Sequence, residues 1–166
     1  MAKKKINILY VDDELNNLNC FTANFRKTYN LFIASSGKEG LEILKENDIH
    51  IIISDQRMPD MTGTKFLAKA REMNPKPMRM ILTAFSDADV LKEAINKINI
   101  YKWLEKPFEE GQIKNAIKDA FEVYELREEG KEIINKLLIM NEKLGAVLTQ
   151  KQLLAELIIK SYEHLN

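Results

Sequence analysis

Short apolar runs rich in β-branched residues alternate with longer amphipathic segments between residues 5 and 121, and this alternation constrains the fold more than any other feature. The five runs are residues 6–11, 31–34, 49–53, 78–82 and 100–104. Three of them contain several consecutive apolar residues, which is typical of strands that helices cover on both faces. Strands and helices in strict alternation, joined by right-handed crossovers, predict an α/β fold with a five-stranded parallel, doubly wound sheet.

The segments that follow the runs have the periodicity of helices. Their apolar residues recur at helical spacing in five ranges, 15–25, 41–44, 66–70, 90–95 and 113–120. Two of these helices begin with a capping pattern, Ser36 followed by Glu39 and Ser86 followed by Asp89, which satisfies free amides at a helix N-terminus. Cys20 is expected on the inner face of the first helix near Phe21, as a buried structural thiol and not a reactive one.

The sequence changes character after residue 121, where no strand-like alternation, proline or turn cluster follows. Steps of four and three residues from Leu126 to Leu165 place apolar residues at nine of twelve seam positions. This 3.5-residue repeat is that of a coiled coil. Gly130 costs a helix about 1 kcal/mol relative to alanine, which makes it a candidate position for a break.

We therefore expect two parts, a domain over residues 1–121 and a C-terminal amphipathic helix over residues 122–166 that forms a coiled coil or a linker. Three explanations of this helix remain open. It forms a parallel coiled coil in a homodimer, which we favour, or it links the domain to an output domain absent from this chain. The third explanation is that it folds back onto its own domain. A helix this apolar must pack on something.

The composition limits the classes of function. The 25 basic and 25 acidic side chains cancel, so no net charge attracts the protein to nucleic acid or to an acidic membrane. One cysteine excludes an internal disulfide framework and a cysteine-rich metal site. The N-terminus does not have the pattern of a signal peptide, and no apolar stretch approaches the roughly 20 residues that cross a bilayer. We expect a cytoplasmic protein that binds neither membranes nor, directly, nucleic acid.

Side chains suited to phosphoryl chemistry follow four of the five predicted strands. Asp12 and Asp13 follow the first strand, Asp55 the third, Thr83 the fourth and Lys106 the fifth. The carboxyl ends of parallel strands meet at one edge, where open α/β sheets bind their ligands. If the first and third strands are neighbours, the three carboxylates converge. Because like charges repel, they then need a cation or shifted pKa values.

These residue types together predict phosphoryl transfer. Magnesium suits the three carboxylates, since it binds one or two of them, keeps several waters and accepts phosphate oxygens. Lys106 would add a positive charge opposite the metal and Thr83 a hydroxyl donor, which stabilise a transferring phosphoryl group. Asp55 is then placed as the nucleophile that forms an aspartyl-phosphate.

Residues 5–121 resemble the receiver domain of the two-component response regulators. The resemblance lies in Asp12-Asp13, the loop Asp-x-x-Met-Pro-x-Met-x-Gly from Asp55 to Gly63, Thr83-Ala84 and Lys106-Pro107-Phe108. It implies a flavodoxin-like fold with strand order 2-1-3-4-5. It also implies a cis peptide bond between Lys106 and Pro107.

The resemblance further implies roles for the acidic residues. Asp55 would accept a phosphoryl group from a sensor histidine kinase or a phosphotransfer protein. Asp12, Asp13 and Asp55 would hold Mg²⁺, and the backbone carbonyl of Arg57 would supply another ligand.

The resemblance also implies a conformational switch. Thr83 would hydrogen-bond the phosphoryl group and Lys106 would pair with it. Trp103 stands where receivers carry a switch aromatic, usually Tyr or Phe, that turns inward when the threonine engages phosphate. The alternative is that Trp103 is a static core residue of the last strand.

The predicted function is a phosphorylation-controlled signalling module and not a metabolic enzyme, acting on an output domain or partner through the C-terminal helix. One alternative is the N-terminal regulatory fragment of a larger output enzyme. Another is a phosphohydrolase of the haloacid dehalogenase type, which also uses an aspartate nucleophile, magnesium and a lysine. That class needs a carboxylate two residues after the nucleophile as general acid, and here this position is Arg57. No recognisable DNA-reading unit follows residue 121.

Overall fold

The computed structural model describes residues 5–84 and 97–163. The chain divides into two compact units, residues 1–124 and residues 125–166. The sheet belongs to the first unit, and the C-terminal part of the last helix makes up the second. The predicted helix at residues 90–95 and the capping pair Ser86–Asp89 lie outside the described residues.

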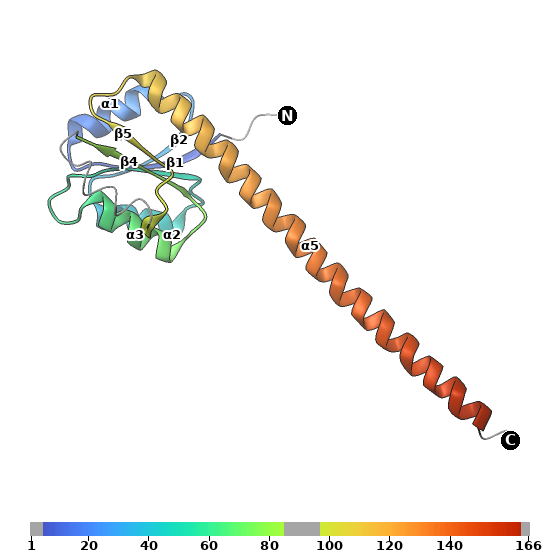
Figure 1. Ribbon diagram of the computed structural model, residues 1–166. Coiled ribbons are helices and arrows are strands. Elements are labelled where there is room, and N and C mark those ends of the chain that lie inside the picture. Colours follow the sequence, from blue (N-terminus) through green and yellow to red (C-terminus); the bar gives the residue numbers. More distant parts are fainter. Residues whose placement is uncertain (1–4, 85–96, 164–166) are drawn as a thin grey trace. The chain divides into compact units, whose positions relative to one another are not determined.

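In the described part of the first unit, five parallel strands form one sheet (Figure 1). Their bounds are β1 Asn7–Val11, β2 Asn30–Ala34, β3 Ile51–Asp55, β4 Met78–Thr83 and β5 Lys102–Glu105. The order across the sheet is β2-β1-β3-β4-β5, and every neighbouring pair is parallel. This order confirms the flavodoxin-like topology and makes β1 the neighbour of β3.

Strand β3 begins two residues later than the apolar run predicts. Its pairing starts at Ile51, which lies opposite Ile8 of β1 and Met78 of β4. The strand continues past the apolar run to Asp55, which lies opposite Leu82. Asp55 is therefore part of the sheet itself, and its backbone is held by the ladder.

Helices cover both faces of the sheet in the first unit. Within residues 5–84 and 97–124 they are α1 Leu15–Phe25, α2 Gly37–Glu46, α3 Gly63–Met73 and the beginning of α5 Glu110–Glu163. Residues of α1 and of the first turns of α5 pack on one face, and residues of α2 and α3 pack on the other (Figure 1). Helix α5 continues without interruption through Gly130 and Gly145, so the candidate break at Gly130 is not found.

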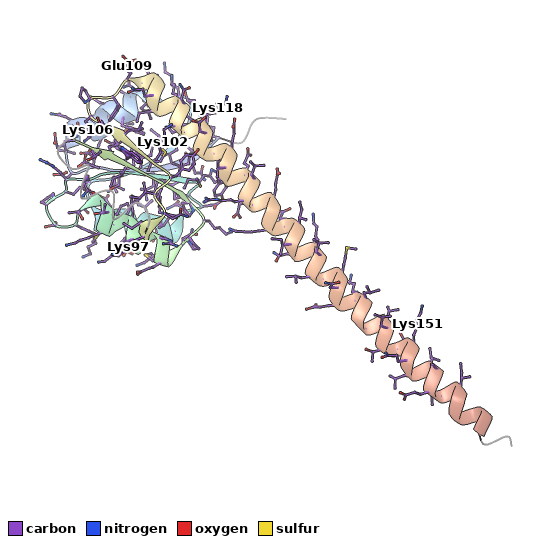
Figure 2. The ribbon with its side chains drawn as sticks, in the orientation of Figure 1. Lys97, Lys102, Lys106, Glu109, Lys118 and Lys151 are labelled. Atoms are coloured by element: carbon purple, nitrogen blue, oxygen red, sulfur yellow. The ribbon has the colours of Figure 1, made fainter. Side chains whose placement is uncertain are left out.

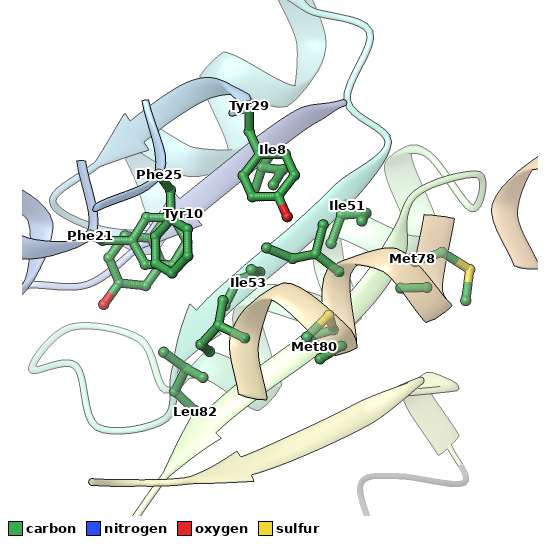
Figure 3. Close-up of a cluster of buried hydrophobic side chains, with 14 of the residues drawn as sticks. Ile8, Tyr10, Phe21, Phe25, Tyr29, Ile51, Ile53, Met78, Met80 and Leu82 are labelled. Atoms are coloured by element: carbon green, nitrogen blue, oxygen red, sulfur yellow. The ribbon is translucent and has the colours of Figure 1, made fainter. Parts of the chain in front are cut away.

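The side chains of each strand alternate between the two faces, as the two-residue period of a strand requires. Ile8 and Tyr10 of β1 belong to the core beneath α1 and α5, whereas Leu9 and Val11 belong to the core beneath α2 and α3. Figure 3 shows the first of these cores, where the Tyr10 ring lies among aromatic side chains of α1. Strands β3 and β4 are buried along their whole length, which explains their continuous apolar runs.

Side-chain caps determine where α2 and α3 begin. The Ser36 side chain accepts a hydrogen bond from the backbone N–H of Glu39, as the capping pattern predicts. The Glu39 carboxylate in turn accepts from the backbone N–H and the hydroxyl of Ser35, at 2.7 and 2.8 Å. Thr62 caps α3 by accepting from the N–H of Lys65. Each cap satisfies a terminal amide that has no partner within the helix.

The buried face of α1 leaves Cys20 outside it. Leu18, Phe21 and Phe25 are buried, but Cys20 is exposed, so the expectation of a buried thiol is wrong. The reason is helical geometry. Successive residues are about 100° apart, and a face centred on the three apolar residues places Cys20 on its flank.

The second unit exposes a series of large apolar side chains. They are Leu126, Ile133, Ile134, Leu137, Leu138, Ile139, Met140, Leu144, Val147, Leu148, Leu153, Leu154, Leu157 and Ile158. Single exposed apolar residues are ordinary, but a contiguous series along one helix marks an interaction surface. Among the residues that the structure describes, no helix combines the length and the apolar character needed to span a membrane.

Gly63, the first residue of α3, lies in close contact with the end of β3. A Cβ at this position would overlap the backbone carbonyl oxygen of Asp55, so an alanine forces the backbone to move. We expect Gly63→Ala to lower the free energy of unfolding by about 1–3 kcal/mol in urea denaturation.

Gly111→Ala is the matched control for this substitution. Gly111 lies in the first turn of α5, and a Cβ there meets nothing within 4 Å. It should leave the free energy of unfolding unchanged or raise it by up to about 1 kcal/mol, because alanine is the better helix former. Equal effects of the two alanines would contradict the tight contact at Gly63.

Candidate functional site

Two neighbouring strands bring two buried carboxylates to one edge of the sheet. Val11 of β1 lies opposite Ser54 of β3. Asp12 follows Val11 and Asp55 follows Ser54, so both side chains lie at the carboxyl ends of their strands. Only 1% of Asp12 and 6% of Asp55 is exposed. Buried carboxylates need partners, because an uncompensated charge in the interior is costly.

Lys106 supplies the opposite charge from the end of β5 (Figure 2). Its Nζ lies 2.5 Å from Oδ1 of Asp55 and 3.3 Å from Oδ2 of Asp12. The backbone N–H of Lys106 donates to the carbonyl of Thr83 at 2.8 Å, which fixes the lysine to the end of β4. The peptide bond from Lys106 to Pro107 is cis, as the resemblance implies.

Asp12 accepts further hydrogen bonds from its own strand and from α1. The Tyr10 hydroxyl donates to Oδ2 at 2.8 Å, and the side-chain amide of Asn17 lies 3.0 Å from each carboxylate oxygen. The backbone N–H of Glu14 donates to Oδ1 at 3.0 Å. The sequence motifs include neither Tyr10 nor Asn17. The available signal for Tyr10 was its spacing of two residues from Asp12, which places both side chains on the same side of the chain.

Burial and the lysine determine the pKa values of this cluster. Burial raises the pKa of Asp55, and the hydrogen bond and charge of Lys106 offset only part of that effect. Burial also acts to lower the pKa of Lys106, but its hydrogen bond with Asp55 and the charges of Asp55 and Asp12 outweigh burial and raise it. Burial and the neighbouring Asp12 carboxylate raise the pKa of Tyr10, so its hydroxyl remains a proton donor.

The loop after β3 is tied back to Gln56. The buried Gln56 side chain accepts from the N–H of Thr64 at 3.1 Å, and its backbone carbonyl accepts from the N–H of Gly63 at 3.0 Å. The backbone N–H of Arg57 donates to Oδ2 of Asp55 at 2.5 Å. The backbone of Arg57 therefore lies beside the Asp55 carboxylate, while the residue as a whole is exposed.

The other predicted site residues differ in their surroundings. Thr83 is buried at the end of β4, and its hydroxyl donates to the carbonyl of Ala84 at 3.1 Å. Trp103 lies opposite Ile81 in β5 but is 50% exposed, so the alternative that it is a core residue is wrong. An edge strand has one neighbour and leaves such a side chain in contact with solvent. Asp13 is exposed.

The oxygen donors at this edge fit magnesium in their chemistry. Asp12 and Asp55 supply carboxylates, the backbone of Arg57 lies beside them, and magnesium prefers such hard oxygen ligands. Within residues 5–84 and 97–163, no three histidine, cysteine, aspartate or glutamate side chains are grouped as metal ligands. The structure thus groups Asp12 and Asp55 with Lys106, while Asp13 faces solvent. A third buried carboxylate would repel the other two, and Lys106 supplies only one positive charge.

A cavity of about 510 Å³ lies beside the cluster, against α1. Its lining includes Tyr10, Cys20, Phe21, Lys106 and Phe108. Most of these side chains are apolar or aromatic, and Lys106 contributes the charge. The lysine therefore lines this cavity as well as pairing with the two carboxylates.

Comparison with known proteins assigns most of the chain to one family. Residues 8–118 match the family described as the response regulator receiver domain. The hydrogenase transcriptional regulatory protein HoxA of Bradyrhizobium diazoefficiens is 30% identical over 122 residues, which are 74% of this chain and 25% of HoxA. The chain spans about a quarter to a third of the length of the curated relatives it matches.

Solved structures share the fold. A chain described as adenylate cyclase from Rhodopirellula baltica has a TM-score of 0.77 and 32% identity, covering 80% of this chain and 99% of that one. A response regulator receiver domain protein from Clostridium thermocellum has a TM-score of 0.69 and 29% identity, covering 73% of this chain and 98% of that one. The descriptions of these relatives name different outputs, a transcriptional regulator and a cyclase.

The burial of Asp55 predicts a pH dependence of stability. Because folding raises its pKa, the folded protein binds this proton more tightly than the unfolded chain does. At pH values above the raised pKa, the ionised Asp55 carboxylate therefore lowers the free energy of unfolding. This destabilisation disappears as the pH falls toward the ordinary pKa of aspartate, because the carboxyl group is then protonated. Without magnesium, Asp55→Asn should be more stable than the wild type at neutral pH, and the difference should shrink on acidification.

Urea unfolding of both proteins between about pH 7 and about pH 4 measures this difference. Asp60→Asn, in the same loop at an exposed position, is the control and should show no such convergence. A wild type more stable than Asp55→Asn at neutral pH would show that the Lys106 ion pair outweighs the burial of the carboxylate.

Proposed function

The chain belongs to the response regulator receiver domain family, and on that premise we propose that Asp55 is the phosphoacceptor of a signalling domain. The observation that carries this proposal is the buried Asp55 carboxylate, 2.5 Å from Nζ of Lys106. It lies at the carboxyl edge of a parallel sheet, where this class of fold binds ligands. The phosphoryl donor is a sensor histidine kinase or a phosphotransfer protein, the partner that the family implies.

The proposed transfer is a displacement at phosphorus. A carboxylate oxygen of Asp55 attacks the phosphorus atom of a phosphohistidine, a P–O bond forms and the P–N bond breaks. The imidazole of the donor leaves with the electron pair of that bond. Lys106 offsets the negative charge of the phosphoryl group, and Thr83 at the end of β4 offers its hydroxyl as a hydrogen-bond donor.

We further propose that magnesium serves this transfer. Asp12, Asp13, Asp55 and the backbone carbonyl of Arg57 would hold the ion, which neutralises charge on the phosphoryl oxygens when bound. The support for Asp12, Asp55 and Arg57 is that they lie together at one edge of the sheet. Asp13 is assigned on its position next to Asp12.

Thr83 and Trp103 are the proposed switch. Thr83 ends β4, and Trp103 lies on the neighbouring strand β5 with half of its surface exposed, which leaves its ring free to change rotamer. A phosphoryl group that accepts a hydrogen bond from the Thr83 hydroxyl would favour the conformation in which the Trp103 ring points inward. The phosphoryl group shifts the equilibrium between the two conformations only as far as it binds one of them better than the other. Helix α5 follows β5 in the chain and offers a route to the output.

The proposed activity is regulation rather than substrate turnover. The phosphohydrolase alternative is not favoured, because Arg57 occupies the position of the required acid and the matching family is the receiver domain. The relatives are longer than this chain, so a regulatory role toward a larger protein remains the second candidate. We also propose a cytoplasmic location without direct nucleic-acid or membrane binding, on the zero net charge of the chain.

We propose that residues 1–121 form the receiver domain and that residues 122–166 join two copies of the chain as a parallel coiled coil. The support is the exposed apolar seam, which includes Leu137, Met140 and Leu144 at alternating spacings of three and four residues. Fully burying such a side chain stabilises by about 1.5–3 kcal/mol. A second copy presents the same seam in the same register, which satisfies the requirement of a symmetric interface.

Asp55→Asn should abolish phosphate uptake, because an amide nitrogen and oxygen cannot replace the carboxylate nucleophile. Incubation with a small acyl phosphate and magnesium, followed by intact-mass spectrometry, should add one phosphoryl group to the wild type and none to the variant. Trp103 is the only tryptophan in the chain. Its emission should change on addition of magnesium and beryllofluoride, a phosphoryl mimic, in the wild type alone.

Asp60→Asn is the control for this experiment as well. It makes the same chemical change in the same loop but at an exposed carboxylate, and it should take up phosphate like the wild type. Phosphorylation that persists in Asp55→Asn would remove the assignment. An unchanged Trp103 emission in a phosphorylated wild type would remove the tryptophan from the switch.

Leu137→Asp combined with Leu144→Asp should convert a dimer into a monomer, because it places charges in the apolar seam. Light-scattering mass should fall by half relative to the wild type. Asn135→Asp combined with Thr149→Asp introduces the same charges on the opposite face of the helix and should leave the dimer intact. A wild type that is monomeric both with and without beryllofluoride would exclude the coiled-coil dimer.

A further inference from the structure

Asp12 accepts hydrogen bonds from three other residues besides its contact with Lys106. Oδ2 accepts from the Tyr10 hydroxyl at 2.8 Å and pairs with Nζ of Lys106 at 3.3 Å. Oδ1 accepts from the N–H of Glu14, and the Asn17 amide lies 3.0 Å from both oxygens. Two of these donors, Tyr10 and Asn17, are side chains outside the motifs that identify the site. Their positions therefore need an explanation of their own.

The Tyr10 hydroxyl is held in place by the hydrophobic core. Tyr10 is 1% exposed, and its ring stacks on Phe21 with centroids 4.0 Å apart and planes inclined by 19°. Phe21 in turn contacts Phe25 at 4.5 Å between centroids, and Figure 3 shows the three rings together. A ring packed in this way cannot turn without displacing its neighbours. Its hydroxyl is thus a donor at a defined point, aimed at Asp12.

Asn17 reaches the same carboxylate from α1. It lies in the first turns of the helix, whose buried residues Leu18 and Phe21 anchor it to the sheet. Its amide reaches both oxygens of Asp12, so a rotation of the carboxylate about its Cβ–Cγ bond would lengthen at least one of these contacts. Tyr10 and Asn17 together restrict Asp12 from the strand and from the helix.

We propose that Tyr10 and Asn17 are positioning residues that hold the Asp12 carboxylate toward Lys106 and toward the proposed magnesium site. This inference rests on the proposed function of Asp55. The oxygen that accepts from Tyr10 is the same one that pairs with Lys106, so the tyrosine orients one of the two anchors of the lysine. Partners that orient a metal-binding group typically change metal affinity by about 10–100-fold when they are removed.

Tyr10→Phe and Asn17→Leu remove the two donors while keeping the bulk of each side chain. Each should weaken magnesium binding by about tenfold in isothermal titration calorimetry. The rate of phosphorylation by a small acyl phosphate should fall at low magnesium and return to within about twofold of the wild type at saturating magnesium. A merely structural role would not produce a loss that magnesium itself restores.

Tyr29→Phe is the matched control. Tyr29 belongs to the same hydrophobic core but precedes β2 at the amino edge of the sheet, the edge opposite Asp12. It should bind magnesium like the wild type. An equal loss in Tyr29→Phe would overturn the proposal in favour of a general effect on the core. If Tyr10→Phe proves unstable in urea unfolding, Asn17→Leu decides the question.

Magnesium affinity that is unchanged or tighter in both variants would overturn the positioning role. Tighter binding would mean that the two donors compete with the ion for Asp12. That result leaves the phosphoacceptor proposal intact as long as the wild type binds magnesium and takes up phosphate. A wild type that does neither would overturn the proposed function itself, and the two failures are therefore distinguishable.

Discussion

The ammonium group of Lys106 allows two carboxylates to be buried side by side at the edge of this sheet. Asp12 and Asp55 belong to adjacent strands and are almost inaccessible to solvent, so without a cation each would carry the cost of an uncompensated buried charge. Lys106 reaches both, and its backbone is tied to Thr83 at the end of β4. The strand order produces this arrangement, because it makes β1 the neighbour of β3 and β4 the neighbour of β5, with all strands parallel. The site is therefore a consequence of topology.

The hydrophobic core and the polar site are connected through Tyr10. Its ring belongs to the aromatic cluster beneath α1, and its hydroxyl belongs to the hydrogen bonds of Asp12. The core thus does more than stabilise the sheet, since it also determines where a donor of the site lies. On the other side, the loop after β3 is closed by Gln56 and by the tight approach of Gly63 to Asp55. Both carboxylates are positioned by contacts that are not themselves part of the phosphoryl chemistry.

The two units of the chain have different roles in the proposed function. The first unit contains the acidic site and belongs to a family of signalling domains, whereas the described residues of the second expose an apolar helical surface. Relatives of the receiver are described as a transcriptional regulator and a cyclase. In the proposed function the output depends on what the helix contacts, and the proposed homodimer is one such contact.

Local properties of the sequence determined the five strands, the helical face of α1 at Leu18, Phe21 and Phe25, and the cap at the start of α2, since periodicity and capping depend on residues close together in the chain. Leu15 has the same helical spacing but is exposed. The acidic and basic residues at the strand ends could be recognised for the same reason, and the family resemblance supplied the strand order. Only the tertiary structure decided that Trp103 is exposed and that Asn17 of α1 donates to Asp12. These features depend on how a helix is rotated against the sheet, on which strand lies at its edge and on distances between elements. None of these is encoded in the spacing of neighbouring residues.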